Sequence, residues 1–200
     1  MSGEAARLRS RNLRTLALLG ALFLLPLLLA FLTYYGSSWR PARHVNHGTL
    51  LEPVRPLPQV PLAVLGNGDQ RLPQRLFTHR WSLVYVGDGR CDADCRQALY
   101  VVRQTRLSLN NDMSRVTRVF LASGDCCARE FLAQQHAGLL VVDASDAAAA
   151  QLLRQFPPER AHTLFVVDPL GNLLMSYDAR QNPHGLLEDL KNLLRLSQIG

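Results

Sequence analysis

The sequence predicts an α/β domain with a central mixed sheet, preceded by a single N-terminal transmembrane helix. Three observations predict this organisation: an uncharged apolar run near the start, β-branched runs that alternate with helical patterns, and a closing strand–turn–strand–helix order. Strands that alternate with helices build parallel sheets that are covered on both faces, and the closing hairpin adds antiparallel strands. The 200 residues (22.3 kDa) accommodate one such domain and an extension.

The apolar run has the length of a membrane span. No charged residue lies between Arg14 and Arg40, and residues 15–35 read TLALLGALFLLPLLLAFLTYY. A helix of this length spans about 30 Å, the hydrocarbon thickness of a bilayer, and a membrane helix tolerates Pro26. A cleaved signal peptide is the alternative, but its apolar core is normally shorter and no clear cleavage site follows Phe31. We therefore expect an uncleaved anchor.

Arginines flank this span unevenly: four precede it and two follow it (Arg7, Arg9, Arg11 and Arg14; Arg40 and Arg43). The positive-inside rule then places residues 1–14 in the cytoplasm and the globular domain on the other side. We expect the inner (cytoplasmic) membrane, with the domain in the periplasm or an equivalent intermembrane space. In such an oxidising compartment the four cysteines (Cys91, Cys95, Cys126 and Cys127) can be oxidised.

The net charge of +6 is concentrated near the N-terminus. Residues 1–60 hold 7 Arg and 2 Glu, whereas residues 61–200 hold 15 basic and 14 acidic side chains. A nearly neutral folded part whose only lysine is Lys191 argues against a nucleic-acid binder. An apolar content of 48% excludes low-complexity disorder.

A tether and a domain follow the span. Residues 36–61 contain five of the eleven prolines (Pro41, Pro53, Pro56, Pro58 and Pro61). Repeated proline favours an extended chain, so we expect a Pro-rich tether rather than a packed element. Fully stretched, it reaches on the order of 80 Å. It lets the domain at residues 62–200 search for a membrane-bound partner, or it is a passive spacer.

The elements of this domain follow from its apolar runs. Strands are predicted at 62–65, 82–86, 116–121, 139–142, 163–167 and 173–177. Helices are predicted at 93–107, at 129–136, in the Ala-rich stretch that follows Ser145, and in the Leu-rich stretch 186–194. Asp143 or Ser145 is expected to cap the Ala-rich helix.

Cys91 and Cys95 lie in the sequence CDADC, where a buried strand passes through a glycine turn into a helix. Cysteines four apart on a regular helix have Cβ atoms about 5–6 Å apart, whereas a disulfide needs about 3.8 Å. Cys91 must therefore lie in the loop or first turn for the pair to close. Two thiolates form a soft site that prefers Cu(I) or zinc, and His162, just before a strand, is the best third ligand.

These motifs resemble the SCO/SenC family, the thioredoxin-like, membrane-anchored copper proteins of cytochrome c oxidase assembly. The resemblance covers residues 62–196 and the anchor, and its motifs are LVYVG before Cys91 and Cys95, and His162 before VVDPLG. It implies that these three residues bind copper, as Cu(I). It also implies that the chain delivers copper to, or reduces the cysteines of, a copper-accepting oxidase subunit.

The chain departs from the family in three places, one of which is a short gap from Cys95 to His162. The family usually has prolines within and after the cysteine motif, and an Asp-Pro-rich loop where this chain has SGDCC at 123–127. Because parallel strands end at the same edge of a sheet, we expect Cys126 and Cys127 on the same side as Cys91. They are then extra copper ligands or a second thiol couple; an exposed pair without a role, or a disulfide to another cysteine, is the alternative.

Several functions remain open from the sequence. A Cu(I) chaperone is favoured over a membrane-anchored thiol–disulfide oxidoreductase, in which an exposed Cys91 attacks and Cys95 resolves the mixed disulfide. A docking factor without chemistry is the third possibility, and the same three ligands also suit zinc. His44 and His47 are expected to be solvated in the tether, with a weak metal site as the alternative. The expected role of His79, His136 and His184 is to cap elements or to lie at the surface.

Overall fold

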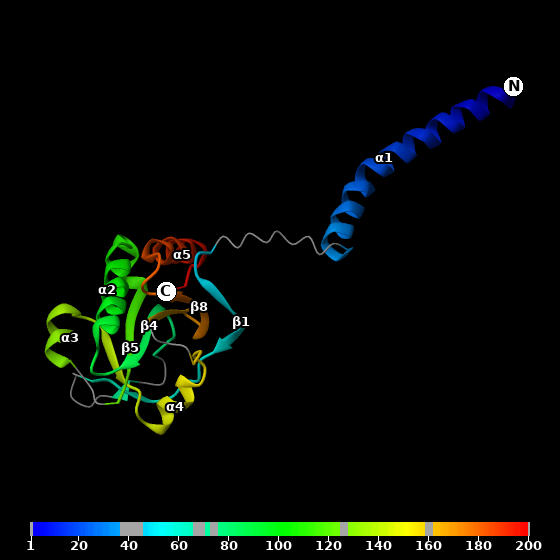
Figure 1. Cartoon of the computed structure of the whole chain (residues 1–200). Coiled ribbons are helices and arrows are strands. Elements are labelled where there is room, and N and C mark those ends of the chain that lie inside the picture. Colours follow the sequence, from blue (N-terminus) through cyan, green and yellow to red (C-terminus); the bar gives the residue numbers. More distant parts are fainter. Residues whose placement is uncertain are drawn as a thin grey trace. The chain divides into compact units, whose positions relative to one another are not determined.

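The computed structural model describes residues 2–36, 46–65, 71–72, 76–124, 128–158 and 162–199. The chain divides into two compact units, Met1–Val45 and Asn46–Gly200 (Figure 1). The first unit consists of α1 (Ser2–Gly36), which contains Pro26. Its stretch Asn12–Gly36 has a mean hydropathy of 2.6 and none of it is buried, so its length and composition suit a membrane span. The predicted anchor lies within this stretch.

The second unit is the α/β domain. Its strands are β1 (Thr49–Pro56), β2 (Leu62–Ala63), β3 (Arg71–Leu72), β4 (Trp81–Asp88), β5 (Val116–Ser123), β6 (Leu140–Asp143), β7 (Thr163–Val167) and β8 (Asn172–Asp178). Its helices are α2 (Ala93–Leu107), the 3₁₀ helix η1 (Asn110–Arg115), α3 (Arg129–Gln135), α4 (Ala147–Leu153) and α5 (Pro183–Leu196).

The sheet is mixed, as predicted, with the strand order β1-β8-β7-β4-β5-β6, while β2 and β3 form a separate pair. β4, β5 and β6 are parallel, and β7 and β8 form the predicted antiparallel hairpin beside β4. Parallel pairing places Asp88 at the end of β4 opposite Ser123 at the end of β5. The loops that follow these two strands therefore open at the same edge of the sheet.

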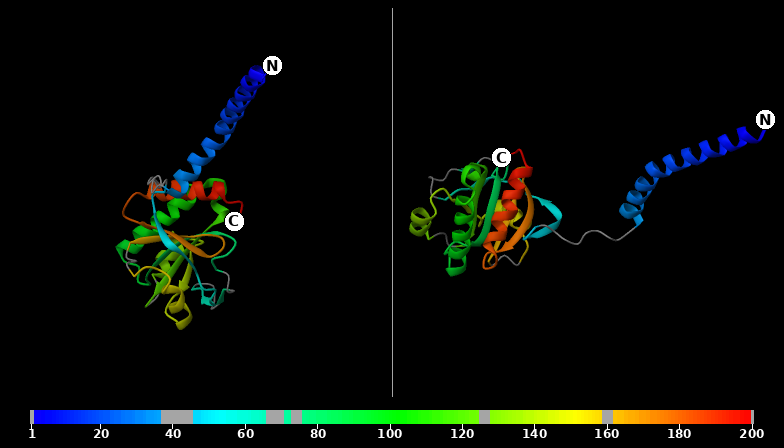
Figure 2. Two further views of the ribbon diagram at one scale, coloured as in Figure 1. Left: turned by 90° about the vertical axis from the view of Figure 1, so that its right-hand side faces the viewer. Right: turned by 90° about the horizontal axis from the view of Figure 1, so that it is seen from above.

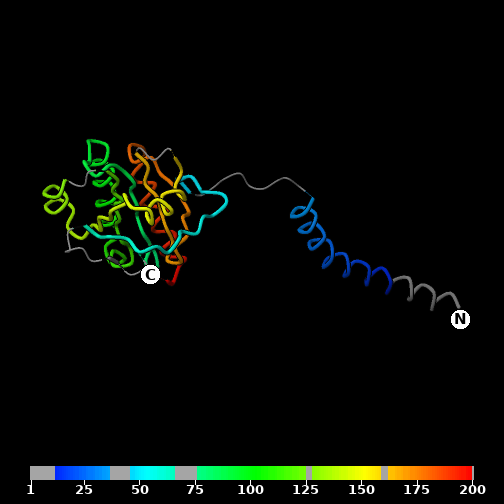
Figure 3. Tube along the Cα trace, turned by 90° about the horizontal axis from the view of Figure 1, so that it is seen from below, coloured from blue at the N-terminus to red at the C-terminus, as the bar shows by residue number. Residues whose placement is uncertain are grey.

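Helices cover both faces of this sheet (Figure 2). Alternate residues of β4 serve opposite faces: Leu83 and Tyr85 pack with α2 and α5, and Val84 and Val86 pack with α4 and residues 57–65. Figure 3 shows this second side, with α4 in yellow near the cyan N-terminal segment of the domain. The central strands are buried on both faces, which explains their continuous apolar runs.

The tether predicted at 36–61 is wrong in its second half, because Thr49–Pro56 form β1, antiparallel to β8. Pro53 and Pro56 are compatible with this strand because it lies at the edge of the sheet and its register shifts between Leu50 and Arg55. The chain stays bound after β1, since the Leu57 N–H donates to the Gly171 carbonyl at 2.8 Å. Residues 37–45 lie outside the described part of the chain.

The cap predicted for the Ala-rich helix, Asp143 or Ser145, is also wrong, because the cap is Asp146. Asp146, directly before α4, accepts a hydrogen bond from the Ala149 N–H at 2.6 Å. Asp143 instead accepts from the Ser145 N–H at 2.9 Å and closes a turn before the helix. Three polar residues stand close together here, and only the one beside the first helical residue has the reach of a cap. The predicted boundaries of α2 and β7 are confirmed.

Candidate disulfide and metal site

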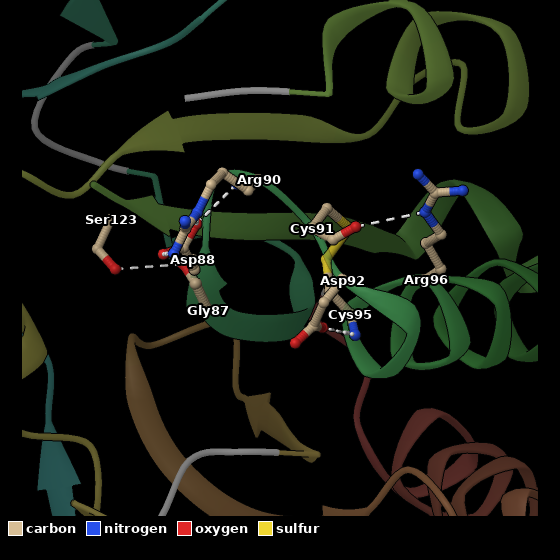
Figure 4. The surroundings of a disulfide bond; sticks show 8 residues. All are labelled: Gly87, Asp88, Arg90, Cys91, Asp92, Cys95, Arg96 and Ser123. Atoms are coloured by element: carbon tan, nitrogen blue, oxygen red, sulfur yellow. Dashed lines mark hydrogen bonds and ion pairs between the residues drawn. A yellow bond between two sulfur atoms is a disulfide. The ribbon is translucent and has the colours of Figure 1, made fainter. Parts of the chain in front are cut away.

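The candidate site begins where β4 ends. The turn after this strand is held by Asp88, whose carboxylate accepts from the Arg90 N–H at 2.8 Å and from the Arg90 guanidinium at 3.1 Å (Figure 4). The Gly89 N–H donates to the Ser123 carbonyl at 2.8 Å, which ties this turn to the end of β5. The cysteine motif therefore starts from a fixed point on the sheet edge.

Cys91 and Cys95 form a disulfide, with their Cα atoms 5.0 Å apart (Figure 4). Cys91 lies outside α2, with a left-handed backbone (φ +50°), and Asp92 caps the helix by accepting from the Cys95 N–H at 3.0 Å. The prediction that Cys91 must lie before or in the first turn is confirmed. The geometric reason is that the helix spacing alone leaves the two sulfurs too far apart.

The oxidoreductase alternative requires an exposed Cys91, but in the disulfide form Cys91 is 1% exposed and Cys95 is 2% exposed. Both belong to the core cluster on the α2 side of the sheet, against which Phe131 of α3 packs. The Arg96 Nε–H donates to the Cys91 carbonyl at 3.3 Å, and its guanidinium lies 4.7 Å from the centre of the Phe131 ring. The sequence did not reveal this cover, because α3 is distant along the chain.

His162 lies directly before β7, as predicted, with a left-handed backbone (φ +65°). Its Nδ1 atom is buried and lies 3.3 Å from Oδ1 of Asp94, without hydrogen-bond geometry. The side chain as a whole is 21% exposed. Asp94 stands inside the CDADC motif, so the fold brings the imidazole to the motif that carries both cysteines.

The sulfurs of Cys91 and Cys95 are bonded to each other in this oxidised form. No three His, Cys, Asp or Glu side chains among the described residues are arranged to hold a metal ion. Reduction of the disulfide gives two thiols in the motif that also contains Asp94, the residue that His162 approaches. The described contacts therefore bring His162 to Asp94, between the two cysteines in the sequence.

Two carboxylates of the cysteine motif act on Tyr85 at this edge of the sheet. Burial, together with the charges of Asp92 and Asp94, raises the pKa of Tyr85 to about 12. Tyr85, Asp88, Asp92 and Ser123 line an open cleft of about 350 Å³ beside the motif. Asp92 and Asp94 thus favour a cation near Tyr85, while Arg90 is paired with Asp88 and Arg96 contacts the Cys91 carbonyl.

Cys126 and Cys127 lie outside the described residues. The residues on either side of them are described, and both contact Gly89: its N–H donates to Ser123, and its carbonyl accepts from the Ala128 N–H at 3.2 Å. The expectation that this loop starts and ends on the same side as Cys91 is therefore confirmed for its flanking residues.

The sheet and helices that carry this motif match a known protein family. Residues 81–197, more than half of the chain, match the family described as "transmembrane-like, thioredoxin-like, C-terminal domain". The chain belongs to this family. As a member of the transmembrane-like, thioredoxin-like family, it combines this fold with the apolar helix α1. No curated protein matches the chain.

Solved structures with the same fold include SCO proteins, as the sequence motifs led us to expect. Apo Sco1 from Thermus thermophilus has 21% identity and a TM-score of 0.60 over 76% of this chain and 99% of its own. Copper-bound yeast Sco1 has 13% identity and a TM-score of 0.62, over 74% and 96%. A DsbF homologue from Corynebacterium diphtheriae has 13% identity and a TM-score of 0.56, over 76% and 96%. These likenesses confirm the thioredoxin-like fold.

Proposed function

We propose that this member of the transmembrane-like, thioredoxin-like family is a membrane-tethered Cu(I)-binding protein. It delivers copper to, or reduces the cysteines of, the copper centre of a cytochrome c oxidase. The observation that carries the proposal is the 3.3 Å approach of His162 to Asp94, inside the cysteine motif. The fold shared with copper-bound yeast Sco1 supports it.

The chemistry of the proposed ligands suits Cu(I). Reduction of the disulfide by two electrons and two protons gives two thiols, and their deprotonation gives two thiolate ligands. Two thiolates and one imidazole are soft to intermediate donors that suit Cu(I), while the neighbouring Asp92 and Asp94 favour a cation. Cys91, Cys95 and His162 are therefore the proposed ligands. Zinc suits the same donors, so metal analysis of the anaerobically reduced chain decides between the ions.

Other residues of the site position these ligands. The Asp92 carboxylate fixes the first turn that carries Cys95, and the Arg96 side chain covers Cys91. Left-handed backbone costs on the order of 1–3 kcal/mol in a residue other than glycine, and it occurs here at both Cys91 and His162. The surrounding structure imposes this strain on two of the three proposed ligands, which supports a functional role for their placement.

A titration of Cu(I) against a chromophoric chelator, with the reduced full chain in detergent micelles, tests the proposal. His162→Asn should lower the Cu(I) affinity at least about tenfold, or 1.4 kcal/mol. Asparagine tolerates left-handed backbone, so the substitution removes the imidazole without adding strain. His79→Asn is the matched control, because His79 is an exposed histidine with a similar φ of +69°. Unchanged affinity in His162→Asn would overturn the proposed ligand set.

A membrane-anchored thiol–disulfide oxidoreductase is the second candidate, favoured by the Cys91–Cys95 disulfide and by the fold shared with the DsbF homologue. In that reaction two substrate thiols become a disulfide while the protein disulfide becomes a dithiol. The 1% exposure of Cys91 opposes this role, since a substrate thiolate must reach a sulfur atom. Oxidation of a dithiol peptide by the chain, at equal rates in wild type and His162→Asn, would support it over copper delivery.

The proposed location is the inner membrane, with the domain in the periplasm, and it rests on the arginine distribution and α1. Fusion of alkaline phosphatase to the C-terminus tests it, because this enzyme is active only after export. An inactive fusion would place the domain on the cytoplasmic side. Its cysteines would then lie in a reducing compartment, which contradicts the proposed location.

A further inference from the structure

We propose a second metal site, for a divalent transition-metal ion such as Zn²⁺, formed by His47, Glu188 and His184. It lies outside the cysteine motif and uses none of its residues. His184 and Glu188 are one turn apart on α5, and His47 comes just before β1. The site therefore joins the start of the domain to its last helix.

The Glu188 carboxylate lies between the two imidazoles. Its Oε2 atom is 3.4 Å from Nε2 of His47, and its Oε1 atom is 3.1 Å from Nε2 of His184. Both histidines thus present the same ring nitrogen to one carboxylate. Two imidazoles, one carboxylate and a water molecule form a common tetrahedral zinc ligand set.

An independent observation concerns the other ring nitrogen of His47. Its Nδ1 atom lies 3.1 Å from Oδ1 of Asp189, a carboxylate that is 4% exposed. Asp189 also accepts from the His47 N–H at 2.7 Å, the Gly48 N–H at 3.0 Å and the Tyr177 hydroxyl at 2.8 Å. An acceptor fixed at Nδ1 holds the proton there and leaves the Nε2 lone pair free, as in histidines that bind metals.

The same contacts anchor the backbone N–H and Nδ1 of His47, whose side chain is 41% exposed. A Cβ atom at Gly185 would lie 2.6 Å from Cβ of His47, so only glycine permits this close approach. The other two ligands have room to move, because the side chains of His184 and Glu188 are 74% and 46% exposed. One ligand is thus preorganised, while the other two can adjust to an ion.

An ion at this site requires only side-chain movement. In the present arrangement the imidazoles contact opposite oxygens of Glu188, and no three described side chains yet face a common point. Rotation of the His184 and Glu188 side chains replaces these two contacts with metal bonds of about 2.0–2.2 Å. The site has no sulfur donor, so it selects Zn²⁺ or Cu²⁺ rather than Cu(I).

Calorimetric titration of ZnCl₂ into the full chain in micelles tests the site. The disulfide is kept intact, and a Cys126→Ser/Cys127→Ser background removes competing thiols. We expect one equivalent of Zn²⁺ to bind, with affinity at least about tenfold lower in His184→Ala and in Glu188→Gln. These variants leave the Asp189 contacts in place, so they should fold. Matched controls are His79→Asn and Glu130→Gln, two exposed positions outside α5.

Nitrogen NMR of the histidine rings gives a second readout. Zn²⁺ should shift the Nε2 resonances of His47 and His184 and leave that of His79 in place. Equal affinity in all variants would overturn the proposal, and so would the absence of any histidine shift at millimolar Zn²⁺. Neither outcome bears on Cu(I) binding by the reduced cysteine motif, because the disulfide is closed throughout.

Discussion

The Nδ1 atom of His162 lies 3.3 Å from Oδ1 of Asp94. This contact joins the start of β7 to the first turn of α2, and it is the point where the imidazole meets the cysteine motif. In metal sites, a carboxylate beside a ligating histidine fixes its ring orientation and tautomer. Asp94 is therefore expected to position His162 for Cu(I) without binding the ion itself.

Replacement of Asp94 tests this role. Asp94→Ala should weaken Cu(I) binding about 10- to 100-fold, the effect typical of losing such a partner. Asp94→Asn should recover part of the affinity, because its amide oxygen can take the place of the carboxylate oxygen beside Nδ1. Chelator competition gives the affinities, and histidine ring NMR shows whether the His162 tautomer changes. If Asp94→Ala keeps both the affinity and the tautomer, Asp94 does not position His162.

The cap at the start of α2 should affect both stability and disulfide reactivity. Asp92→Ala removes the acceptor of the Cys95 N–H and should cost about 1 kcal/mol of unfolding free energy, measured by urea titration. Because the first turn of α2 would fray without this cap, dithiothreitol should also reduce the disulfide faster. Asp146→Ala removes the equivalent cap of α4 and should cost a similar amount without changing the reduction rate. Equal reduction rates in both variants would contradict the predicted link.

The Arg96 side chain, which lies between the Cys91 carbonyl and the Phe131 ring, should limit the access of reductants to the disulfide. Arg96→Ala removes the hydrogen bond to the Cys91 carbonyl and the contact with Phe131. Loss of a cation–π contact of about 1 kcal/mol corresponds to about fivefold faster reduction of the disulfide. Arg195→Ala, on the exposed side of α5, should leave the rate unchanged. A wild-type rate in Arg96→Ala would show that the cover lies elsewhere.

Asp189 should make the free energy of unfolding depend on pH. Burial opposes its ionisation, but hydrogen bonds from Gly48, Tyr177 and His47 outweigh this and lower the pKa of Asp189. A lowered folded-state pKa contributes stability above the unfolded value of about 3.9, and this stability is lost as the pH falls through the folded value. The unfolding free energy of the wild type should therefore fall steeply below about pH 4.

The control for this prediction is Asp189→Asn. At pH 7 it should be less stable by about 2–3 kcal/mol, since donors to a buried charge lose their partner. The difference from wild type should shrink in acid, where the wild-type carboxyl is also neutral. Asp178, whose pKa is lowered to about 2 by hydrogen bonds from Arg180, titrates in both proteins and cancels in this difference. Parallel pH profiles would contradict the assignment to Asp189.

Most of the domain could be predicted from its sequence, because its strands are buried and its helices are amphipathic. β7 and α2 had clear signals in composition, and the position of Cys91 followed from disulfide geometry. β1 was missed because its two prolines indicate a loop, and only pairing with β8 makes it a strand. The edge position of a strand is a property of the sheet, and no local pattern contains it.

The site could be predicted only as a set of residue types. Cys91, Cys95 and His162 stood out because their chemistry and local context are unusual. The pairing of Asp94 with His162, and of His47 with Asp189, joins segments far apart in the chain. Such contacts depend on the packing of β7 against α2 and of the domain's first residues on α5. Single-sequence patterns do not contain that information.

β1 limits the pairing of strands between neighbouring copies of the protein. An anchored protein meets its neighbours at high local concentration, where a bare strand with free N–H groups would invite lateral pairing and aggregation. β1 shields β8 from such pairing, and Pro53 and Pro56 carry no N–H to offer to an incoming strand. The two prolines thus protect the solubility of the domain at the side where its sheet would otherwise continue into another molecule.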